Sequence, residues 1–159
     1  MNIKSLAIGN EIHEFAKELW PINRSITGKG VRETLKLIKG HLPQLKINSV
    51  LSGTNVFDWT VPKEWSVKEA YIITPSGEKI CDFSKNNLHL VGYSVPFQAS
   101  ISLDELKKHL YTLPDQPSAI PYVTSYYKKR WGFCLTQDQF NNLKAVSYTH
   151  LTLPTILRV

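Results

Sequence analysis

The sequence has only two cysteines and no long apolar run. Cys81 and Cys134 lie far apart, and neither belongs to a Cys-x-x-Cys pair, which excludes a disulfide framework and zinc-knuckle spacing. Polar residues from Gly9 to Glu14 interrupt any apolar core of a signal peptide, and no stretch approaches the length of a membrane span. These absences predict a soluble, cytoplasmic protein with reduced thiols and no membrane partner.

Complete catalytic motifs are absent as well. The helical zinc-protease motif His-Glu-x-x-His begins at His13, but Lys17 occupies the position of its second histidine. A phosphate-binding loop would need glycine in place of Asn23, and Ser or Thr in place of Gly30. There is no Gly-x-Ser-x-Gly nucleophile elbow. The sequence therefore offers no self-sufficient active site.

Charge is moderately basic and scattered. The chain has 19 Lys and Arg against 13 Asp and Glu, a formal net charge of +6. No run of basic residues is longer than the three at 128–130. Because nucleic-acid-binding proteins usually gather their basic residues on one face, we expect no nucleic-acid partner.

The first 48 residues are predicted to form two helices. Apolar residues of the first recur at steps of three and four and would share one face: Ile8, Ile12, Phe15, Ala16 and Leu19. Pro21 ends this helix, because proline lacks an N–H and disfavours helical geometry in the residue before it. The second helix has an apolar stripe of Val31, Leu35, Ile38 and Leu42, and Pro43 follows it.

A β-rich module is predicted for residues 49–145. The periodicity changes to short runs typical of strands at 46–51, 56–61, 69–74, 79–83, 88–95 and 130–135. The turn at 75–78 contains Gly77 and indicates a hairpin. Ser102 with Glu105, and Thr136 with Gln139, predict two short capped helices. The predicted fold class is therefore α+β, with two helices before a small β-rich domain.

The loop between the two helices contains one group of candidate binding residues. A glycine-containing turn that enters a helix presents backbone N–H groups, which favour an anion. Arg24, Ser25, Thr27 and Gly28 could therefore bind and position a substrate carboxylate. The other interpretation, an ordinary structural turn, is the one that we favour.

Two aromatic-rich stretches, at 57–65 and 121–134, supply a second group. Arg130 and Trp131 are the candidate substrate-binding residues of the later stretch. The aromatic residues that could hold a sugar, a peptide or another subunit are Trp59, Trp65, Tyr126, Tyr127 and Trp131. Tryptophan and tyrosine also build the cores of small β domains, and because burial is the common use of aromatic residues we favour the core interpretation. Exposed rings would favour binding instead.

Several of these stretches, in order, resemble a known family. They are residues 19–28 (Leu-Trp-Pro-Ile-Asn-Arg-Ser-Ile-Thr-Gly), 31–35 (Val-Arg-Glu-Thr-Leu), 56–65, 87–89, 110–117 and 120–134. The chain is similar to bacterial aminopeptidase-like proteins, also labelled polysaccharide biosynthesis proteins with an aminopeptidase-like domain. The resemblance covers about residues 10–144.

This resemblance implies a larger protein. Its α/β zinc-exopeptidase-like domain would begin with residues 1–48 and be interrupted by a β-rich inserted domain at 49–145. The family's zinc ligands follow the insertion, so this N-terminal fragment is expected to bind no metal and to be inactive alone. The intact protein would use zinc to hydrolyse a peptide or peptide-like substrate. A role of the inserted domain in contacts between identical subunits is a further alternative.

Residues 146–159 stand apart from the rest. The run at 146–155, Val-Ser-Tyr-Thr-His-Leu-Thr-Leu-Pro-Thr, resembles the conceptual translation of a transposon-end sequencing adaptor. The alternative is an edge strand, because Val146, Tyr148 and His150 alternate with hydroxyl residues. We expect 146–159 to be an adaptor-derived tail, and we exclude it from the prediction of the fold.

Overall fold

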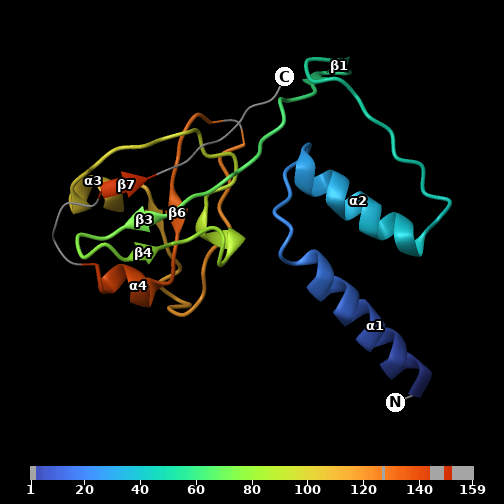
Figure 1. Ribbon diagram of the computed structural model, residues 1–159, viewed down its shortest axis with the longest axis horizontal. Helices are drawn as coiled ribbons and strands as arrows, with labels where there is room; N and C mark the ends of the chain where they lie inside the picture. Colours follow the sequence, from blue (N-terminus) through green and yellow to red (C-terminus); the bar gives the residue numbers. More distant parts are fainter. Residues whose placement is uncertain (1–2, 127, 144–148, 152–159) are drawn as a thin grey trace. The chain divides into compact units, whose positions relative to one another are not determined.

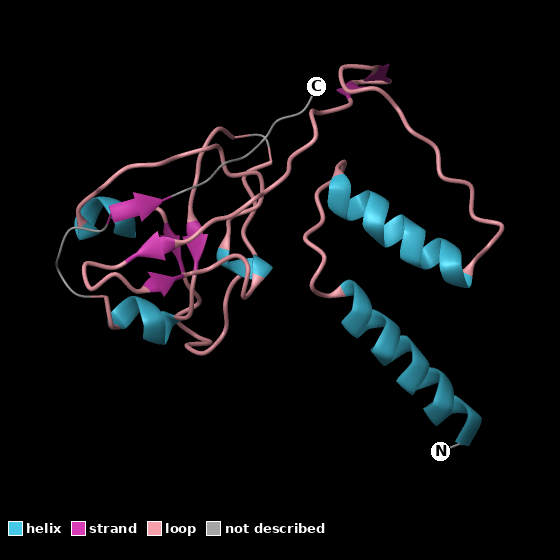
Figure 2. Cartoon of the chain, in the orientation of Figure 1, coloured by secondary structure: helices cyan, strands magenta, loops and turns pink. Residues whose placement is uncertain are grey.

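The computed structural model describes residues 3–126, 128–143 and 149–151 of the chain. Two compact units are present, Met1–Pro62 and Lys63–Val159. Figure 1 follows the chain by colour, and Figure 2 shows how little of it lies in strands. The sequence places the start of the β-rich domain at residue 49, whereas the division between the units follows Pro62.

The first unit contains the two predicted helices, α1 (Ile3–Leu19) and α2 (Lys29–His41). The last turn of α1 closes with a hydrogen bond from Trp20 N to Ala16 O, and the chain then meets Pro21. The C-terminal end of α2 is closed by Leu42 N, which donates to Ile38 O. Both ends therefore fall at the prolines that the sequence marks as helix breakers.

The described residues of the first unit bury little apolar surface. No residue of α2 is buried, and the residues of its apolar stripe Val31, Leu35 and Ile38 are only half-buried. Its exposed large apolar residues are Ile8, Ile12, Trp20, Ile26, Leu42, Ile47, Val50, Leu51, Val56, Phe57 and Trp59. Exposed apolar surface on this scale is typical of a region that packs against further protein.

The strand predicted at 46–51 is absent, and that prediction is wrong. These residues have irregular backbone and pair with no segment that the structure describes. Alternation alone cannot form a strand, which needs a partner for its backbone groups. The single strand predicted at 56–61 is also wrong, because these residues contain a turn. There β1 (Asn55–Val56) pairs with β2 (Trp59–Thr60) as a hairpin, with Phe57 and Asp58 at the turn.

The second unit contains the predicted hairpin at 75–78. It joins β3 (Ile72–Ile73) to β4 (Lys79–Ile80), and β3 also pairs with β7 (Thr149–Leu151), all antiparallel. Thr74 N donates to Glu78 O and Gly77 N to Thr74 O, each at 2.9 Å. Gly77 has φ of 85°, a conformation that glycine adopts without a steric penalty. Of the predicted tail, only residues 149–151 are described, and they form the edge strand β7 beside β3, in line with the edge-strand alternative.

Two short helices begin where the sequence places their caps. Ser102 Oγ accepts from Glu105 N at the start of α3 (Leu103–Lys107). Thr136 and Gln139 form a reciprocal capping box at the start of α4 (Gln137–Asn141). Each cap satisfies backbone N–H groups that have no partner within the helix.

The strand predicted at 88–95 is also wrong. Residues Asn87–His89 form a 3-10 helix, η1, because the Asn86 side chain accepts from Leu88 N and turns the backbone. After it, Leu90 makes a single antiparallel bridge to Phe133. Phe133 itself lies in β6 (Phe133–Cys134), which pairs in parallel with β5 (Leu110–Tyr111).

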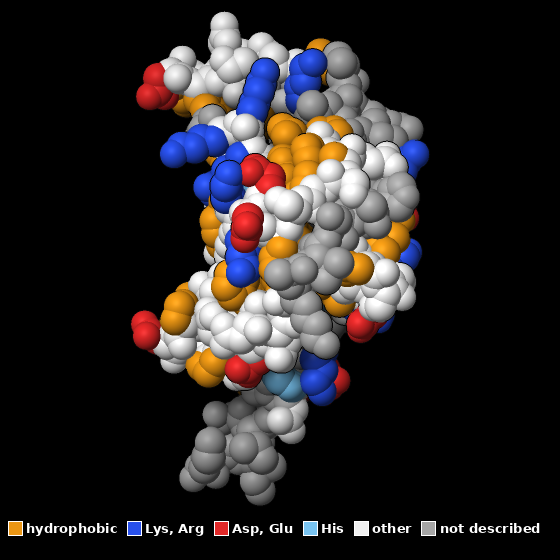
Figure 3. Space-filling view, turned by 90° about the vertical axis from the view of Figure 1, so that its left-hand side faces the viewer, with side chains coloured by type: hydrophobic (Ala, Val, Ile, Leu, Met, Phe, Trp, Pro, Cys, Tyr) orange, Lys and Arg blue, Asp and Glu red, His pale blue; other side chains and the backbone are white. Residues whose placement is uncertain are grey.

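The core of the second unit forms around these pairings. It is a single cluster of buried residues, namely Trp65, Ala70, Ile72, Cys81, Leu90, Leu103, Leu106, Leu110, Trp131, Phe133 and Leu135. The Trp65 indole N–H donates to Ser94 O at 3.1 Å, so this buried ring keeps a polar partner. On the face shown in Figure 3, basic and acidic side chains are interspersed, with apolar side chains exposed between them. This mixed charge is typical of an ordinary protein surface.

Candidate functional site

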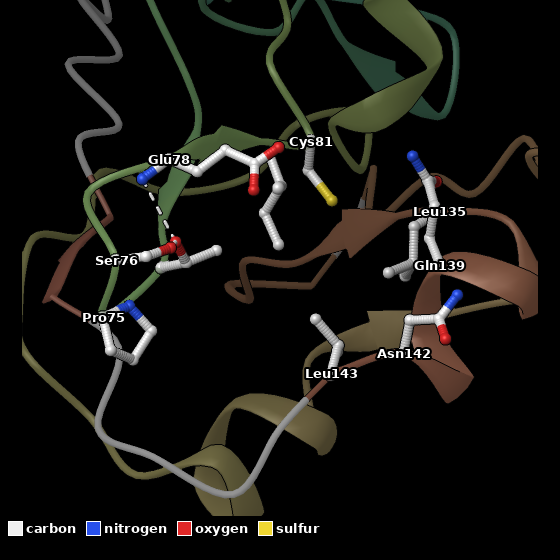
Figure 4. Close-up of a pocket in the computed structure, with 10 residues that line it drawn as sticks. Pro75, Ser76, Glu78, Cys81, Leu135, Gln139, Asn142 and Leu143 are labelled. Carbon is white, nitrogen blue, oxygen red and sulfur yellow. Dashed lines mark hydrogen bonds between the residues drawn. The ribbon is translucent and has the colours of Figure 1, made fainter.

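A pocket of about 530 Å³ lies between the β3–β4 hairpin and α4 (Figure 4). The hairpin supplies Thr74, Pro75, Ser76, Glu78, Ile80 and Cys81, and the chain at and around α4 supplies Leu135, Gln139, Asn142 and Leu143. Because the hairpin turn and the capping box hold both walls, the pocket is formed by structured segments. Its size lies within the range of small-molecule sites, roughly 300–1,000 Å³.

The hairpin wall is polar near its turn. Thr74 Oγ1 lies 2.8 Å from Ser76 Oγ and accepts from Glu78 N at 3.1 Å. The two hydroxyl groups therefore hydrogen-bond to each other, and that of Thr74 also accepts from a backbone N–H of the turn. The Glu78 side chain is exposed, and in Figure 4 it extends toward Cys81. This wall thus presents a carboxylate beside two hydroxyl groups.

The Cys81 thiol lies at the inner end of this wall. Its residue is 3% exposed, and its backbone has φ of 50°, in the left-handed region. Burial, together with the nearby Cys134 thiol, raises the pKa of Cys81 to about 12. A thiol with so high a pKa stays protonated at neutral pH, and only the thiolate is a nucleophile. Cys81 therefore lines the pocket as a neutral, apolar group.

The opposite wall combines a fixed amide with apolar side chains. Gln139 Oε1 accepts from Thr136 N at 3.0 Å, while Gln139 N donates to Thr136 Oγ1 at 3.0 Å. The capping box thus orients the Gln139 amide, whose nitrogen donates to no other residue within the described ranges. Leu135 is fully buried and Leu143 half-buried, so this wall also offers apolar surface.

The predicted group at 24–28 lies in the loop between α1 and α2. One Arg24 Nη donates to Leu19 O at 2.8 Å, at the C-terminal end of α1, and lies 3.5 Å from Thr34 Oγ1. Ser25 Oγ donates to Thr27 O within the same turn. Gly28, with φ of 142°, is the N-cap residue of α2. The loop therefore brings all four predicted residues together, and backbone carbonyls of α1 and of the loop accept hydrogen bonds from the Arg24 and Ser25 side chains.

Close packing fixes this loop against the first turn of α2. A Cβ atom at Gly30 would lie 1.9 Å from Asn23 O, far inside van der Waals contact. Only glycine allows the backbones of residues 23 and 30 to approach in this way. The sequence marks the glycines of this turn, but it does not reveal the close approach.

The predicted pair Arg130 and Trp131 belongs to the second unit. One Arg130 Nη donates to Thr124 O at 2.9 Å and the other lies 3.3 Å from the Tyr111 hydroxyl oxygen. Trp131 is 7% exposed and belongs to the core cluster. The Arg130 contacts link the loop at 124 to β5, and Trp131 packs in the core. Both side chains therefore stabilise the fold.

Burial separates the two interpretations of the aromatic stretches. Trp65 and Trp131 are buried, which favours the core interpretation for both rings. Tyr126 is half-buried, and Tyr127 lies outside the described residues. Trp59 is 36% exposed, beside the exposed Phe57 in the β1–β2 hairpin. The aromatic residues thus do not form one exposed binding surface across the described ranges.

The histidines near the core serve structural contacts. His89 Nδ1 lies 2.8 Å from Cys134 O, and His109 Nδ1 lies 3.2 Å from Trp131 O. Throughout the described part of the chain, no group of three or more His, Cys, Asp and Glu side chains is placed to hold a metal ion. No helix among these residues is both long and apolar enough to cross a lipid bilayer.

Comparisons with known proteins identify the family. Residues 64–152 match the profile of DUF2172, a domain of unknown function, and the chain belongs to this family. Over 135 residues it is 56% identical to a Clostridium acetobutylicum protein named "Putative polysaccharide biosynthesis protein with aminopeptidase-like domain". That match covers 85% of this chain and 31% of the relative.

A solved structure gives the same result. The chain matches the crystal structure of a "putative peptidase" from Clostridium acetobutylicum with a TM-score of 0.91 and 51% sequence identity. The match covers 96% of this chain and 36% of that chain. The resemblance to aminopeptidase-like proteins is therefore confirmed, and the chain spans about a third of the length of these relatives.

Sequence reasoning did not find the pocket beside the hairpin. The hairpin turn and the capping box are visible in the sequence as separate local signals. Their meeting around Cys81 depends on how the β3–β4 hairpin and α4 pack, which no local pattern records. The polar turn at 75–78, with Cys81 three residues beyond it, was the one available hint.

Proposed function

We propose that this chain forms the first part of a zinc-dependent, aminopeptidase-like hydrolase that acts on peptide or peptide-like substrates. In this proposal α1 and α2 begin the α/β peptidase-like domain, and the β-rich unit is inserted into it. The chain alone would be inactive. The observation that carries the proposal is the match to a peptidase-named structure at 51% identity and a TM-score of 0.91.

The zinc ion of this proposal would be held elsewhere in the whole protein. The described residues do not fit a zinc site, because they bring no three His, Cys, Asp or Glu side chains together. A zinc site in proteins needs three or four such ligands. The part of this chain in the reaction would therefore be to bind and orient the substrate.

Arg24 is the residue that we propose for this orienting role. Its exposed guanidinium is held by Leu19 O through one nitrogen, and the packing of Gly30 against Asn23 O fixes its loop. A planar guanidinium that is already oriented can pair with a carboxylate through two parallel hydrogen bonds. Ser25, Thr27 and the N–H of Gly28 lie in the same loop and would complete the contact.

The test uses the whole protein rather than this chain alone. Its bound zinc is quantified, and peptide hydrolysis is compared between the wild type, Arg24→Ala and the control Arg32→Ala in α2. We expect the whole protein to bind zinc stoichiometrically. We expect kcat/KM to fall roughly tenfold or more in Arg24→Ala, which corresponds to the loss of one charge-assisted hydrogen bond, and to stay unchanged in Arg32→Ala. Unchanged turnover of Arg24→Ala, with α1 still helical, would remove Arg24 from the site. A whole protein without zinc would refute the zinc-dependent hydrolase.

A further inference from the structure

We propose that the pocket between the β3–β4 hairpin and α4 binds a small ligand that carries an α-ammonium group, a branched apolar side chain and a carbonyl. Such a ligand is an amino-acid amide or the first residue of a peptide. The proposal rests on the lining of the pocket in this chain and does not depend on hydrolysis by the whole protein.

The charge of the pocket selects the ammonium group. Glu78 is its one carboxylate, and no Lys, Arg or His is among the described lining residues. Among the described residues, the ion pairs do not include Glu78, and its one hydrogen bond to a side chain is made by its backbone N–H to Thr74 Oγ1, so the carboxylate is not engaged there. A cationic amine would give it a charge-assisted hydrogen bond, whereas an anionic ligand would be repelled.

The inner surface of the pocket selects the branched apolar side chain. Ile80, Leu135 and Leu143 line it together with the Cys81 thiol. That thiol is buried beside Cys134, so it adds neither a charge nor a nucleophile to the surface. Burial of an apolar group against these side chains is favourable by roughly 25 cal/mol per Å². Figure 4 shows Glu78 and Cys81 on the hairpin side, across from Leu135 and Leu143.

The carbonyl of the ligand has one oriented donor. The Gln139 amide oxygen is held by Thr136 N in the capping box, which directs the amide nitrogen away from that bond. The hydroxyls of Thr74 and Ser76 already satisfy each other. The pocket thus offers an acceptor for an ammonium group, apolar surface for a side chain and a donor for a carbonyl.

The experiment compares three probes with the full chain. Leucinamide has all three groups, 4-methylpentanamide lacks only the ammonium, and leucine carries a carboxylate instead of the amide. Binding is followed by the NMR shifts of the Ile80, Leu135 and Leu143 methyl groups. We expect leucinamide to bind with a Kd on the order of 1 mM, about threefold tighter than 4-methylpentanamide, and leucine to bind more weakly than leucinamide.

A matched pair of variants tests the role of Glu78. Glu78→Gln should weaken leucinamide about threefold and leave 4-methylpentanamide unchanged, because only the first probe carries the ammonium. Glu69→Gln removes the same charge from a residue that does not line the pocket and should change neither affinity. Equal affinities for leucinamide and 4-methylpentanamide, an unchanged affinity in Glu78→Gln, or no shift of the three residues' methyl groups would each overturn the proposal.

Discussion

The indole ring of Trp131 lies parallel to the imidazole of His109, with ring centroids 3.8 Å apart and an interplanar angle of 14°. Phe97 stacks on the same indole at 4.2 Å and 14°. Two rings at these distances would overlap if they lay on one face, so they cover opposite faces of Trp131. Both indole faces are therefore occupied by the protein's own rings, which explains why this tryptophan is structural.

Replacing Trp131 by alanine should strongly destabilise the second unit. The substitution removes a buried ring with two stacked partners, so we expect the free energy of unfolding to fall by about 3–5 kcal/mol. Urea unfolding followed by near-UV circular dichroism measures this loss. Tyr122→Ala, at a residue that is 78% exposed, is the control and should change it by about 0.5 kcal/mol or less. Similar effects of the two substitutions would contradict the core role of Trp131.

Gly30→Ala and Gly40→Ala should have opposite effects within one helix. At Gly30 the new Cβ would lie 1.9 Å from Asn23 O, so the loop must move, with an expected cost of about 1–3 kcal/mol. At Gly40 nothing lies within 4 Å of the new atom, and alanine should stabilise α2 by roughly 0.5–1 kcal/mol. Thermal melts followed by far-UV circular dichroism compare the two variants. A stabilising Gly30→Ala would show that the close approach to Asn23 does not exist.

Thr136→Ala should loosen the start of α4. The substitution removes the acceptor of Gln139 N and one half of the capping box, with an expected loss of about 1 kcal/mol. Hydrogen exchange at the Gln139 amide should become faster. Thr136→Ser retains the hydroxyl and should behave like the wild type. Equal exchange rates in the alanine and serine variants would count against the cap.

The two buried thiols should make the second unit less stable at high pH. Burial raises the pKa values of Cys81 and Cys134 from 9.0 to about 12. Above pH 9 the unfolded chain loses these protons more readily than the folded chain, so unfolding becomes easier as pH rises from 9 to 12. Below pH 9 the thiols contribute no pH dependence. The two thiols therefore lower the stability of the folded unit only at alkaline pH.

Urea midpoints at pH 8 and pH 10 measure this effect, with a Cys81→Ala, Cys134→Ala double variant as the control. We expect the wild type to lose stability between the two pH values and the double variant to lose less. Alkylation of the native thiols by iodoacetamide at pH 8 should also be slow, because the thiolate is scarce and the groups are buried. Rapid alkylation of the folded chain would show that the thiols are accessible.

The features that the sequence predicts correctly depend on neighbouring residues. The prolines that end both helices, the glycine of the β3–β4 turn and the caps of α3 and α4 act within a few positions of the chain. Local hydrogen bonds and steric limits decide these structures, so they can be inferred without knowing the rest of the fold.

Most of the features that the sequence misses depend on distant residues, and one depends on a local side chain that the pattern of apolar residues does not reveal. Residues 46–51 alternate like a strand but have no partner, and the Asn86 side chain turns residues 87–89 into a 3-10 helix. The pocket beside the hairpin arises from packing across the unit. The same packing buries Trp65 and Trp131, for which the sequence favours the core interpretation. The family resemblance supplies the peptidase context, while the roles of Arg24 and its loop remain predictions for experiment.

The pairing of Phe133 bears on how this unit is made during synthesis. Its strand joins Leu110 in parallel, and its backbone bridges to Leu90, so it connects segments that are translated well before it. Contacts of such long sequence separation form late, because the intervening loops must first be closed. Until residues 131–135 leave the ribosome, the nascent chain of this unit would therefore stay open and prone to aggregation. We expect chaperones to bind the nascent chain until that segment emerges.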